Sequence, residues 1–487
     1  MERGTHAIVA GGSIAGLLAA RVLADHAGRV TVVERDHLPA DPVPRAGVPQ
    51  ARHVHILLQR GQHLLEEMFP GLDAELAAAG VPTMNLTSEF PVMGLGGWTV
   101  RYPSPFVMRT CSRVRLEWTI RQRLAALGNV QFRDGLRVTG LLATGDRSRV
   151  TGVRVQARES GAESAELAAD LVVDASGRTS HAPEWLGTLG YGAPREVVVN
   201  SFLGYSTRWY EAPADARRDW KGLMVGSLAP HVSRSAVIFP AENGLWVVTL
   251  VGYARDYPPT DEAGFMEFAR SLRSPIVYDS IKDARPVTPI YGYQRTENLW
   301  RHYERLARWP EGFVVLGDAA CAFNPVYGQG MTTAAVGAQV LARCLSAENG
   351  RPLPRQVGMA RRFQKMLARA AATPWLMATG EDFRWETTEG GRPSPATRLM
   401  HRYMDSVLRQ TARSPHAYTT FLEVAQLLKP PPALFSPAMI GELLTQAVLE
   451  KIGLSKGRPV GTIPRPVPSG AALNHDGDLA LGVADIA

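Results

Sequence analysis

Val9-Ala10-Gly11-Gly12-Ser13-Ile14-Ala15-Gly16 joins an apolar segment to a helical one through a glycine-rich turn. A short buried strand is expected over 6–9, and apolar spacing predicts a helix over 13–26. A second strand is expected over 29–34, and its last residue is Glu34. This order of strand, turn, helix, strand and acid is typical of a Rossmann-like α/β domain that binds a dinucleotide.

The turn residues suggest separate roles in such a site. Gly11 would make the tight turn and Gly16 would permit close helix–strand packing, while Ser13 replaces the glycine that normally lets the backbone approach a pyrophosphate. The helix N-terminus offers free N–H groups to phosphates, and Glu34 can accept both hydroxyls of an adenosine ribose. Arg35 is placed with the expected cofactor-binding residues. The alternative is an ordinary βα turn.

A second segment lies about three hundred residues later in the chain. A strand is expected over 313–316, followed by Asp318, and the turn Gly328-Gln329-Gly330-Met331 opens a helix. An acid at a strand end can bind a polyol hydroxyl, and the N–H groups of the new helix at Met331 could face the pyrimidine oxygen of a flavin. A tight surface turn remains the alternative.

These segments carry a family resemblance. Gly317-Asp318-Ala319 with Pro325-x-x-Gly328-x-Gly330 is similar to the flavin segment of FAD-dependent aromatic hydroxylases and squalene-epoxidase-like proteins. The stretch Asp174-Ala175-Ser176-Gly177-Arg178-Thr179-Ser180 resembles their middle motif, which lies near the flavin diphosphate and the presumed NAD(P)H path. The resemblance therefore implies that Asp174 and Asp318 belong to an FAD site.

Two further stretches extend the resemblance. Ser112-Arg113-Val114-Arg115-Leu116-Glu117 resembles the helix whose arginine, here Arg113, reaches the cofactor. Arg45-Ala46-Gly47-Val48-Pro49-Gln50 resembles the loop that passes along the flavin. The expected flavin-face residues are Gln50, Pro325, Tyr327 and Gln329, of which Tyr327 and Gln329 could equally pack the turn.

Within this family, the likeness is strongest to the polyene epoxidases of polyether biosynthesis, the lasalocid and monensin type. It runs through residues 47–53, 111–113, 309–312 and 322–328, and covers most of 5–380. The resemblance implies that NAD(P)H reduces the FAD, that O₂ adds to give a C4a-hydroperoxide, and that one oxygen atom passes to an alkene or an electron-rich ring. It also leaves room for a separate flavin reductase.

The choice between epoxidation and hydroxylation depends on a base. Phenol hydroxylation gains from a side chain that deprotonates the phenol, whereas alkene epoxidation needs none. The sequence displays no convincing base, which favours epoxidation of a polyketide or terpenoid alkene in secondary metabolism, such as antibiotic biosynthesis. Aromatic hydroxylation is the alternative, followed by a flavin-dependent reductase or a non-catalytic flavoprotein.

Two related activities are disfavoured by missing motifs. Flavin halogenases resemble this chain but use a lysine soon after the first βαβ unit, and no lysine here precedes Lys221. Their Trp-x-Trp-x-Ile-Pro segment is also missing. Geranylgeranyl-reductase relatives carry Tyr-x-Trp-x-Phe-Pro, and Ser235–Pro240 reproduces only its second half.

The 487 residues predict more than one domain. We expect an FAD-binding domain over 1–75, 103–190 and 285–375, with an inserted antiparallel substrate-binding sheet over 76–102 and 191–284. Alternation places Trp209, Phe239 and Trp246 on this sheet, either lining a pocket for a hydrophobic small molecule or as ordinary core. A C-terminal helical region over 376–454 and a loosely ordered tail over 455–487 complete the chain.

Three secondary-structure expectations outside the glycine motifs are specific enough to test. A helix is predicted over 53–69, with His53 and His55 as hydrogen-bonding residues at its start rather than acid/base groups. Strands over 150–157 and 166–173 are predicted to pair through a polar turn at 158–163. The helices after Pro325 are predicted to be broken once, at Lys429-Pro430-Pro431-Pro432.

Charge and cysteine usage limit the function classes. The net charge of +7 comes mainly from arginines mixed with acids, which argues against nucleic-acid binding. No apolar stretch is long enough to span a membrane, and no metal-ligand spacing is present. Cys111, Cys321 and Cys344 are widely spaced, so free thiols in a reducing cytoplasm are expected.

Overall fold

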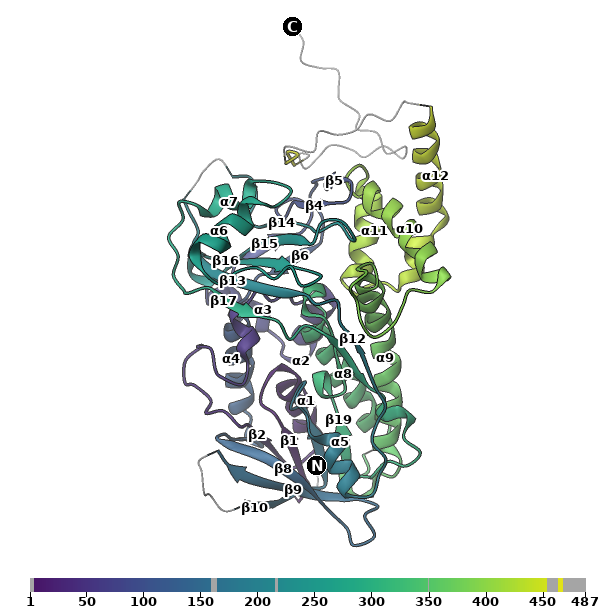
Figure 1. The fold of residues 1–487 in the computed structure, drawn as a ribbon. Coiled ribbons are helices and arrows are strands. Elements are labelled where there is room, and N and C mark those ends of the chain that lie inside the picture. Colours follow the sequence, from purple (N-terminus) through teal and green to yellow (C-terminus); the bar gives the residue numbers. More distant parts are fainter. Residues whose placement is uncertain (1–3, 159–163, 215–217, 349, 453–462, 467–487) are drawn as a thin grey trace.

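A parallel sheet of five strands organises the lower half of the molecule in Figure 1. The computed structural model describes residues 4–158, 164–214, 218–348, 350–452 and 463–466. Because the strands are parallel, their carboxyl ends meet at one edge. The strand order is β19 (Phe313–Val315), β11 (Leu171–Asp174), β1 (His6–Ala10), β2 (Arg29–Val33) and β7 (Val130–Arg133).

Helices and a small sheet cover the parallel sheet. Helix α1 (Ile14–Ala24) packs against α4 (Arg113–Ala125) and α8 (Gly330–Ser346), and its leucines are fully buried in the main apolar core. A three-stranded antiparallel sheet, β8 (Leu136–Ala143), β9 (Val150–Ala157) and β10 (Ser164–Ala168), packs against β11 through β9. The expected Rossmann-like core is thus present.

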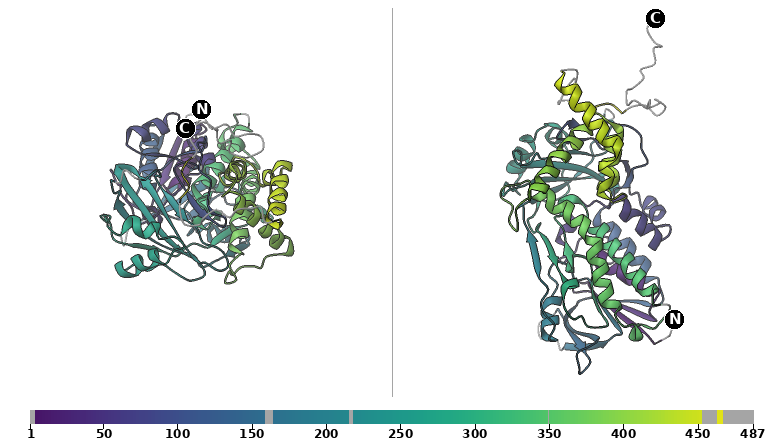
Figure 2. Two further views of the ribbon diagram at one scale, coloured as in Figure 1. Left: turned by 90° about the horizontal axis from the view of Figure 1, so that it is seen from above. Right: turned by 90° about the vertical axis from the view of Figure 1, so that its right-hand side faces the viewer.

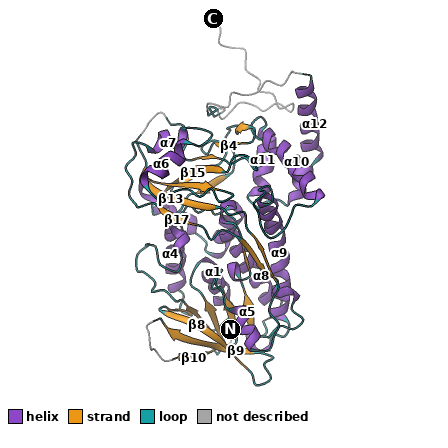
Figure 3. Ribbon diagram, in the orientation of Figure 1, coloured by secondary structure: helices purple, strands orange, loops and turns teal. Residues whose placement is uncertain are grey.

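A second large sheet forms the upper part of the molecule, separate from the parallel sheet (Figure 3). Its outer face is covered by α6 (Glu262–Arg270) and α7 (Ile276–Ile281). Its pairings are antiparallel except that of β4 with β14. The order is β17 (Tyr291–Tyr293), β13 (Gly204–Glu211), β16 (Leu245–Gly252), β15 (Arg234–Ala241), β14 (Leu223–Val225), β4 (Val92–Gly94) and β5 (Gly97–Trp98).

The C-terminal helices run from the parallel sheet to the second sheet, as the right-hand view of Figure 2 shows. They are α9 (Met359–Asp382), α10 (Pro395–Gln410), α11 (Pro415–Ala425) and α12 (Pro437–Lys451). A small sheet of β12 (Glu196–Val199), β18 (Asn298–Arg301) and β20 (Cys321–Ala322) lies beside α9, which contacts β18. The remaining elements are α2 (Gln59–Met68), α3 (Leu72–Ala78), α5 (Ala182–Thr188), β3 (Thr83–Asn85) and β6 (Val107–Arg109).

The helix predicted over 53–69 begins later than expected. Helix α2 starts at Gln59, and a short 3₁₀ turn over Pro49–Arg52 precedes an extended segment. The cause is tertiary: Nδ1 of His53 lies 2.7 Å from the Thr207 hydroxyl, and the Val54 N–H donates to Thr249 at 3.4 Å. The two histidines are therefore not at a helix start, because their segment is bonded to the second sheet.

The strand predicted over 166–173 is two strands. Residues 164–168 pair with β9, whereas 171–174 enter the parallel sheet beside β1. Between them, Asp170 accepts the His6 N–H at 2.8 Å and donates its own N–H to the His6 carbonyl. This exchange redirects the chain from one sheet to the other. Most of the expected polar turn, 159–163, lies outside the described residues.

The C-terminal predictions need a similar correction. The helical region is interrupted between α9 and α10 and between α10 and α11, and not only at the prolines. Of the tail, only 463–466 are described. There the Pro464 carbonyl accepts from Arg101 at 2.9 Å and Ile463 packs against the second sheet. The rest of the predicted loose tail lies outside the described residues.

Candidate active site

Two of the glycines mark where three loops meet at the carboxyl edge of the parallel sheet. A Cβ atom on Gly11, whose φ is +106°, would lie 2.5 Å from the Ala175 carbonyl oxygen in the loop after β11. A Cβ on Gly317 would lie 2.6 Å from the Cβ of Ala15 at the start of α1. The loops after β1, β11 and β19 are therefore in contact, so the motifs that are distant in sequence form one site.

Arg45 is held by three carboxylates at one end of this site. Its guanidinium lies 2.9 Å from Asp36, 3.2 Å from Glu34 and 2.8 Å from Glu117. The same Glu34 oxygen accepts the Gly12 N–H at 2.8 Å. The expected ribose acid is thus fixed to the glycine turn, with Arg45 beside it.

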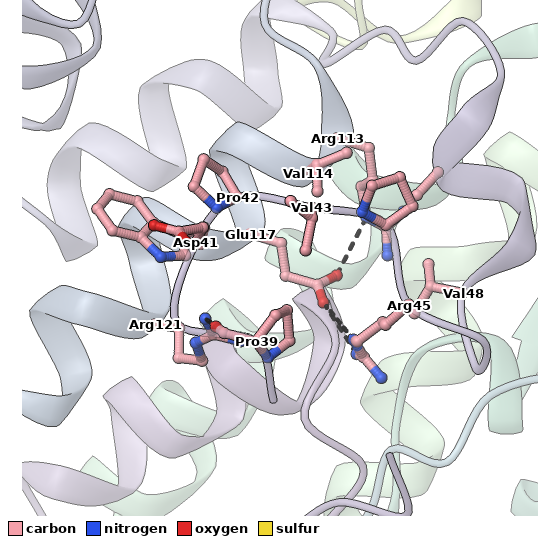
Figure 4. A pocket seen from close by; sticks show the side chains of 13 residues that line it. Pro39, Asp41, Pro42, Val43, Arg45, Val48, Arg113, Val114, Glu117 and Arg121 are labelled. Atoms are coloured by element: carbon pink, nitrogen blue, oxygen red, sulfur yellow. Dashed lines mark hydrogen bonds and ion pairs between the residues drawn. The ribbon is translucent and has the colours of Figure 1, made fainter. Parts of the chain in front are cut away.

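Glu117 joins the two arginines that the sequence assigns to the cofactor, and Figure 4 shows it between Arg113 and Arg45. Arg113 donates to the Ser13 hydroxyl at 2.6 Å, and that hydroxyl donates to Glu117 at 2.8 Å. Burial opposes ionisation of Glu117, but the Arg113 and Arg45 guanidiniums outweigh it and hold the pKa of this carboxyl below its ordinary value. The sequence analysis missed Glu117, although its spacing of four residues from Arg113 on a helix was a usable signal.

A small pocket that is open to solvent lies beside this charged cluster. Its walls combine the proline-rich loop with side chains of α4, as Figure 4 shows. It is lined by Pro39, Asp41, Pro42, Val43, Pro44, Arg45, Val48, Ala51, Arg113, Val114, Glu117, Trp118 and Arg121. Arg45 and Glu117 of the charged cluster thus line the same pocket as the apolar side chains of the proline-rich loop.

Two of the assigned residues do not present their side chains as expected. Asp174 is fully buried, and its oxygens accept from the Ser176 N–H, the Ser176 hydroxyl and the Ser180 hydroxyl. Burial raises its pKa. Asp174 therefore orders its own loop instead of offering a free carboxylate. Arg35 is exposed and has no hydrogen bond or ion pair among the described residues.

Asp318 has the exposure that a ligand-binding acid needs. Its side chain is 40% exposed in a 3₁₀ turn over Gly317–Ala319, directly after β19. Its one ion-pair partner in the described structure is Arg178 of the middle motif, at 4.0 Å. The structure thus leaves this carboxylate largely available at the meeting point of the loops.

The N-terminus of α8 is also open to a ligand. Nothing lies within 4 Å of a Cβ built on Gly330, and Gly328 ends the preceding turn with a φ of +65°. Gln329 is buried, and its side-chain oxygen has no hydrogen-bond partner among the described atoms. Met331 lines a second small pocket together with His55 and Cys111. The unpartnered Gln329 oxygen lies beside the N-terminal N–H groups of α8. Together they would suit a ring whose edge carries both hydrogen-bond donors and acceptors.

The other flavin-face candidates divide into open and bonded residues. Pro325 is exposed and Gln50 is half-buried in the 3₁₀ turn before α2. The Tyr327 hydroxyl instead donates a hydrogen bond to Asp382 at 2.8 Å. Asp382 is fully buried at the end of α9. Asp382 is the second functional candidate that the sequence analysis missed, since nothing near it in sequence points to Tyr327.

The turn that carries Pro325 and Tyr327 touches the second sheet. Val326 packs against an apolar cluster that includes Tyr205, Tyr253 and Trp385. Three aromatic residues were expected to line a pocket. Phe239 packs against Phe90 on the inner face of the second sheet, whereas Trp246 stacks on Trp220 on the outer face. Trp209 donates its indole N–H to the Arg52 carbonyl at 2.9 Å.

His53 lies at the same junction and is neutral. Its ring packs near Tyr205 and Tyr293, with centroids 6.0 and 5.6 Å away. Burial and the Arg52 guanidinium lower its pKa to about 4. His53 therefore anchors its loop through Thr207 and is not a proton acceptor near neutral pH.

These residues fit FAD along the carboxyl edge of the sheet. Glu34, with Arg45 beside it, would hold the adenosine ribose, and Ser13 with Arg113 would face the diphosphate. Asp318 would hold the ribityl chain, and the start of α8 would meet the ring. In the described residues, no helix is long and apolar enough to cross a membrane.

Comparison with known proteins gives the same assignment. Residues 4–350 match the family model described as "FAD binding domain". The protein Rv3254 of Mycobacterium tuberculosis is 35% identical over 379 residues, which is 76% of this chain and 79% of that protein. A kynurenine 3-monooxygenase of Salinispora tropica is 26% identical over 366 residues, or 72% of this chain and 74% of that enzyme.

Solved structures share the fold at low identity. The flavin-dependent brominase Bmp2 superposes with a TM-score of 0.64 at 15% identity, covering 93% of this chain and all of that one. The anhydrotetracycline hydroxylase OxyS of Streptomyces rimosus superposes with a TM-score of 0.56 at 17% identity, covering 87% and 76%. With the family model covering most of the chain, this protein belongs to the FAD-binding domain family and is a flavin-dependent monooxygenase.

Proposed function

We propose that the chain inserts one oxygen atom of O₂ into a largely apolar small molecule of secondary metabolism, with NAD(P)H as the reductant. FAD supplies the oxygen chemistry when bound, and the protein orients the substrate and excludes water. The observation that supports this proposal best is the contact of the Pro325–Tyr327 turn with the aromatic inner face of the second sheet. A substrate between them would lie against apolar side chains.

Two reactions are candidates. Epoxidation of a polyketide or terpenoid alkene is implied by the resemblance to polyene epoxidases. The apolar cluster around Tyr205, Tyr253 and Val326 supports it, because an alkene needs a dry wall and no base. The same apolar side chains would also contact the hydrocarbon part of a polyketide chain.

Hydroxylation of an aromatic ring is favoured by a different observation. The preference for epoxidation rested on the lack of a base in the sequence, and the buried Asp382 bonded to Tyr327 supplies a candidate base. A phenol that loses its proton becomes more electron-rich and a better oxygen acceptor. Asp382 therefore makes phenol hydroxylation the reaction that the geometry supports better.

The cellular setting is part of the proposal. Cys111, Cys321 and Cys344 are free thiols, which suits a reducing cytoplasm. A separate flavin reductase is the alternative source of electrons in this proposal, because the described residues form one parallel sheet of the dinucleotide-binding type.

The test is product analysis with isotopically labelled O₂. Purified holoenzyme with NADPH is incubated separately with a panel of polyenes and a panel of phenols. We expect one labelled oxygen atom in the product of one panel, with NADPH consumption stimulated by that panel. Hydrogen peroxide as the only product with both panels would contradict the proposed oxygen insertion.

A further inference from the structure

Glu242 is a buried carboxylate that reaches from the second sheet to the start of α4. It lies in the turn between β15 and β16 and is 8% exposed. One of its carboxylate oxygens accepts the Ser112 N–H at 3.0 Å, and the other accepts the Ser112 hydroxyl. The two residues are 130 positions apart in the chain, so this contact joins the second sheet to a helix that packs on the parallel sheet.

The shape of the turn sets the direction of Glu242. Asn243 and Gly244 follow it with φ values of +62° and +67°, and this residue pair in the left-handed region is typical of tight hairpin turns. The Gly244 carbonyl also accepts the Ala212 N–H, which comes from the end of β13, at 2.9 Å. The turn is therefore fixed by its own backbone and by a neighbouring strand.

Ser112 is the N-cap residue of α4. Its hydroxyl oxygen accepts the Arg115 N–H at 3.1 Å, which satisfies one of the free donors of the first helical turn. The backbone N–H of an N-cap residue has no partner within the helix. Glu242 accepts both this N–H and the hydroxyl hydrogen, and a carboxylate at a helix N-terminus is favoured by the helix dipole. Glu242 therefore fixes the start of α4.

Arg113 is the first residue of α4 and depends on this start. Its guanidinium donates to the Ser13 hydroxyl at 2.6 Å and lies 3.3 Å from Glu117. Without Glu242, both donors of the buried Ser112 would lack their acceptor, and a buried donor without a partner is costly. The first turn of the helix would then shift or fray, and Arg113 would lose its fixed direction.

We propose that Glu242 is a positioning residue for Arg113. By holding Ser112 through both of its donors, Glu242 keeps the arginine directed at Ser13, where the FAD diphosphate would lie. The inference rests on the diphosphate contact proposed for Ser13 and Arg113. It makes the affinity for FAD depend on a residue of the second sheet, and so links the cofactor site to the sheet that is proposed to hold the substrate.

The first test is the affinity of the apoprotein for FAD, measured by fluorescence titration. Glu242→Ala removes the acceptors of both Ser112 donors, so the Kd for FAD should rise at least tenfold. Glu242→Gln keeps the size of the side chain and one acceptor oxygen, so the Kd should rise only about threefold. Chemical denaturation of each apoprotein measures the loss of stability separately from the loss of FAD affinity.

The second test asks whether Glu242 acts through Arg113. Arg113→Met removes the guanidinium but keeps a long side chain, and it should itself weaken FAD binding. In this background Glu242→Ala should raise the Kd for FAD by less than about twofold more, because the group that it positions is gone. Independent residues would instead have effects that multiply.

Ser394→Ala is the matched control for a weakened helix start. Ser394 is the N-cap residue of α10, where its hydroxyl accepts the Thr397 N–H at 3.1 Å. Its replacement removes a cap of the same kind from another helix, and the Kd for FAD should stay within about twofold of wild type. Equal losses of FAD affinity in Ser394→Ala and Glu242→Ala would contradict a specific role for Glu242.

Three further outcomes would overturn the inference. They are unchanged FAD affinity in Glu242→Ala, the same fold loss from Glu242→Ala with and without Arg113, and wild-type FAD affinity in Arg113→Met. None of them depends on turnover. A protein that shows the expected coupling but oxygenates neither panel would instead overturn the proposed function and leave the positioning role of Glu242 established.

Discussion

The buried carboxylates at the two ends of the candidate site have pKa values that are shifted in opposite directions. At the end proposed for the adenosine, Glu117 lies between Arg113 and Arg45, and its pKa is held below the ordinary value. At the end proposed for the flavin ring, Asp382 accepts from amide and hydroxyl donors, and burial raises its pKa to about 6. Ion pairs with arginine fix the geometry of the carboxylate at one end, whereas no cation among the described residues pairs with Asp382 at the other, which leaves that carboxyl free to titrate. Four substitutions test this contrast.

Arg45→Ala should have the largest effect, because it leaves Glu34, Asp36 and Glu117 without their shared cation. Removing one partner of a buried ion pair costs roughly 3–5 kcal/mol of unfolding free energy. Chemical denaturation measures the loss. The exposed pair of Arg154 and Glu166 gives the control, since Arg154→Ala should cost ~0.2–1 kcal/mol. Equal losses in the two variants would show that the charged cluster has no special role.

Asp382→Asn should change how stability depends on pH. The folded-state pKa of about 6 lies above the ordinary 3.8, so the folded protein keeps a proton that the unfolded chain releases. The resulting stabilisation is complete below about 3.8 and is lost as pH rises through about 6. Wild type should therefore lose about 3 kcal/mol relative to the variant across this window. Parallel pH profiles of the two unfolding free energies would contradict the raised pKa.

Asp318→Ala tests the point where the two ends meet. Its carboxylate is 40% exposed and directly follows β19, so its loss should remove a charged acceptor for the ribityl chain. We expect FAD affinity to fall at least tenfold, or ~1.5–3 kcal/mol, measured as flavin content and by titration of the apoprotein. Asp146→Ala, in a distant exposed loop, should leave binding unchanged. A variant with full flavin content would refute the assigned role.

Glu34→Ala should have the smallest effect on folding, since Asp36 and Glu117 remain with Arg45. FAD affinity should still fall about tenfold, which is ~1.4 kcal/mol, because the ribose acceptor is gone. Fluorescence titration with FAD measures this change. Unchanged affinity would count against the ribose contact.

Local patterns predicted the core of the fold well. The strand–turn–helix around Gly11, Glu34 directly after β2 and the strand before Asp318 follow from short-range periodicity, and the structure places them at one edge. The start of α2 was missed because Thr207 and Thr249 of the second sheet bind the segment before it, and no local pattern encodes that contact.

Interactions within the site could be predicted from the sequence only where both residues of a pair lie in one motif. Glu117 lies four residues after Arg113 and could have been found. Asp382 lies 55 residues after Tyr327, and the burial that raises its pKa is produced by β18 and the crossover into β13 packing around α9. Asp174 carried a motif match yet bonds its own loop, because a sequence pattern does not report where a carboxylate points.

The proposed chemistry requires that this chain holds an FAD that NADPH reduces. Anaerobic titration of the purified protein with NADPH, followed through the visible flavin bands, tests it most directly. We expect yellow protein whose bands bleach as NADPH is added. Colourless protein that cannot be reconstituted with FAD would contradict it.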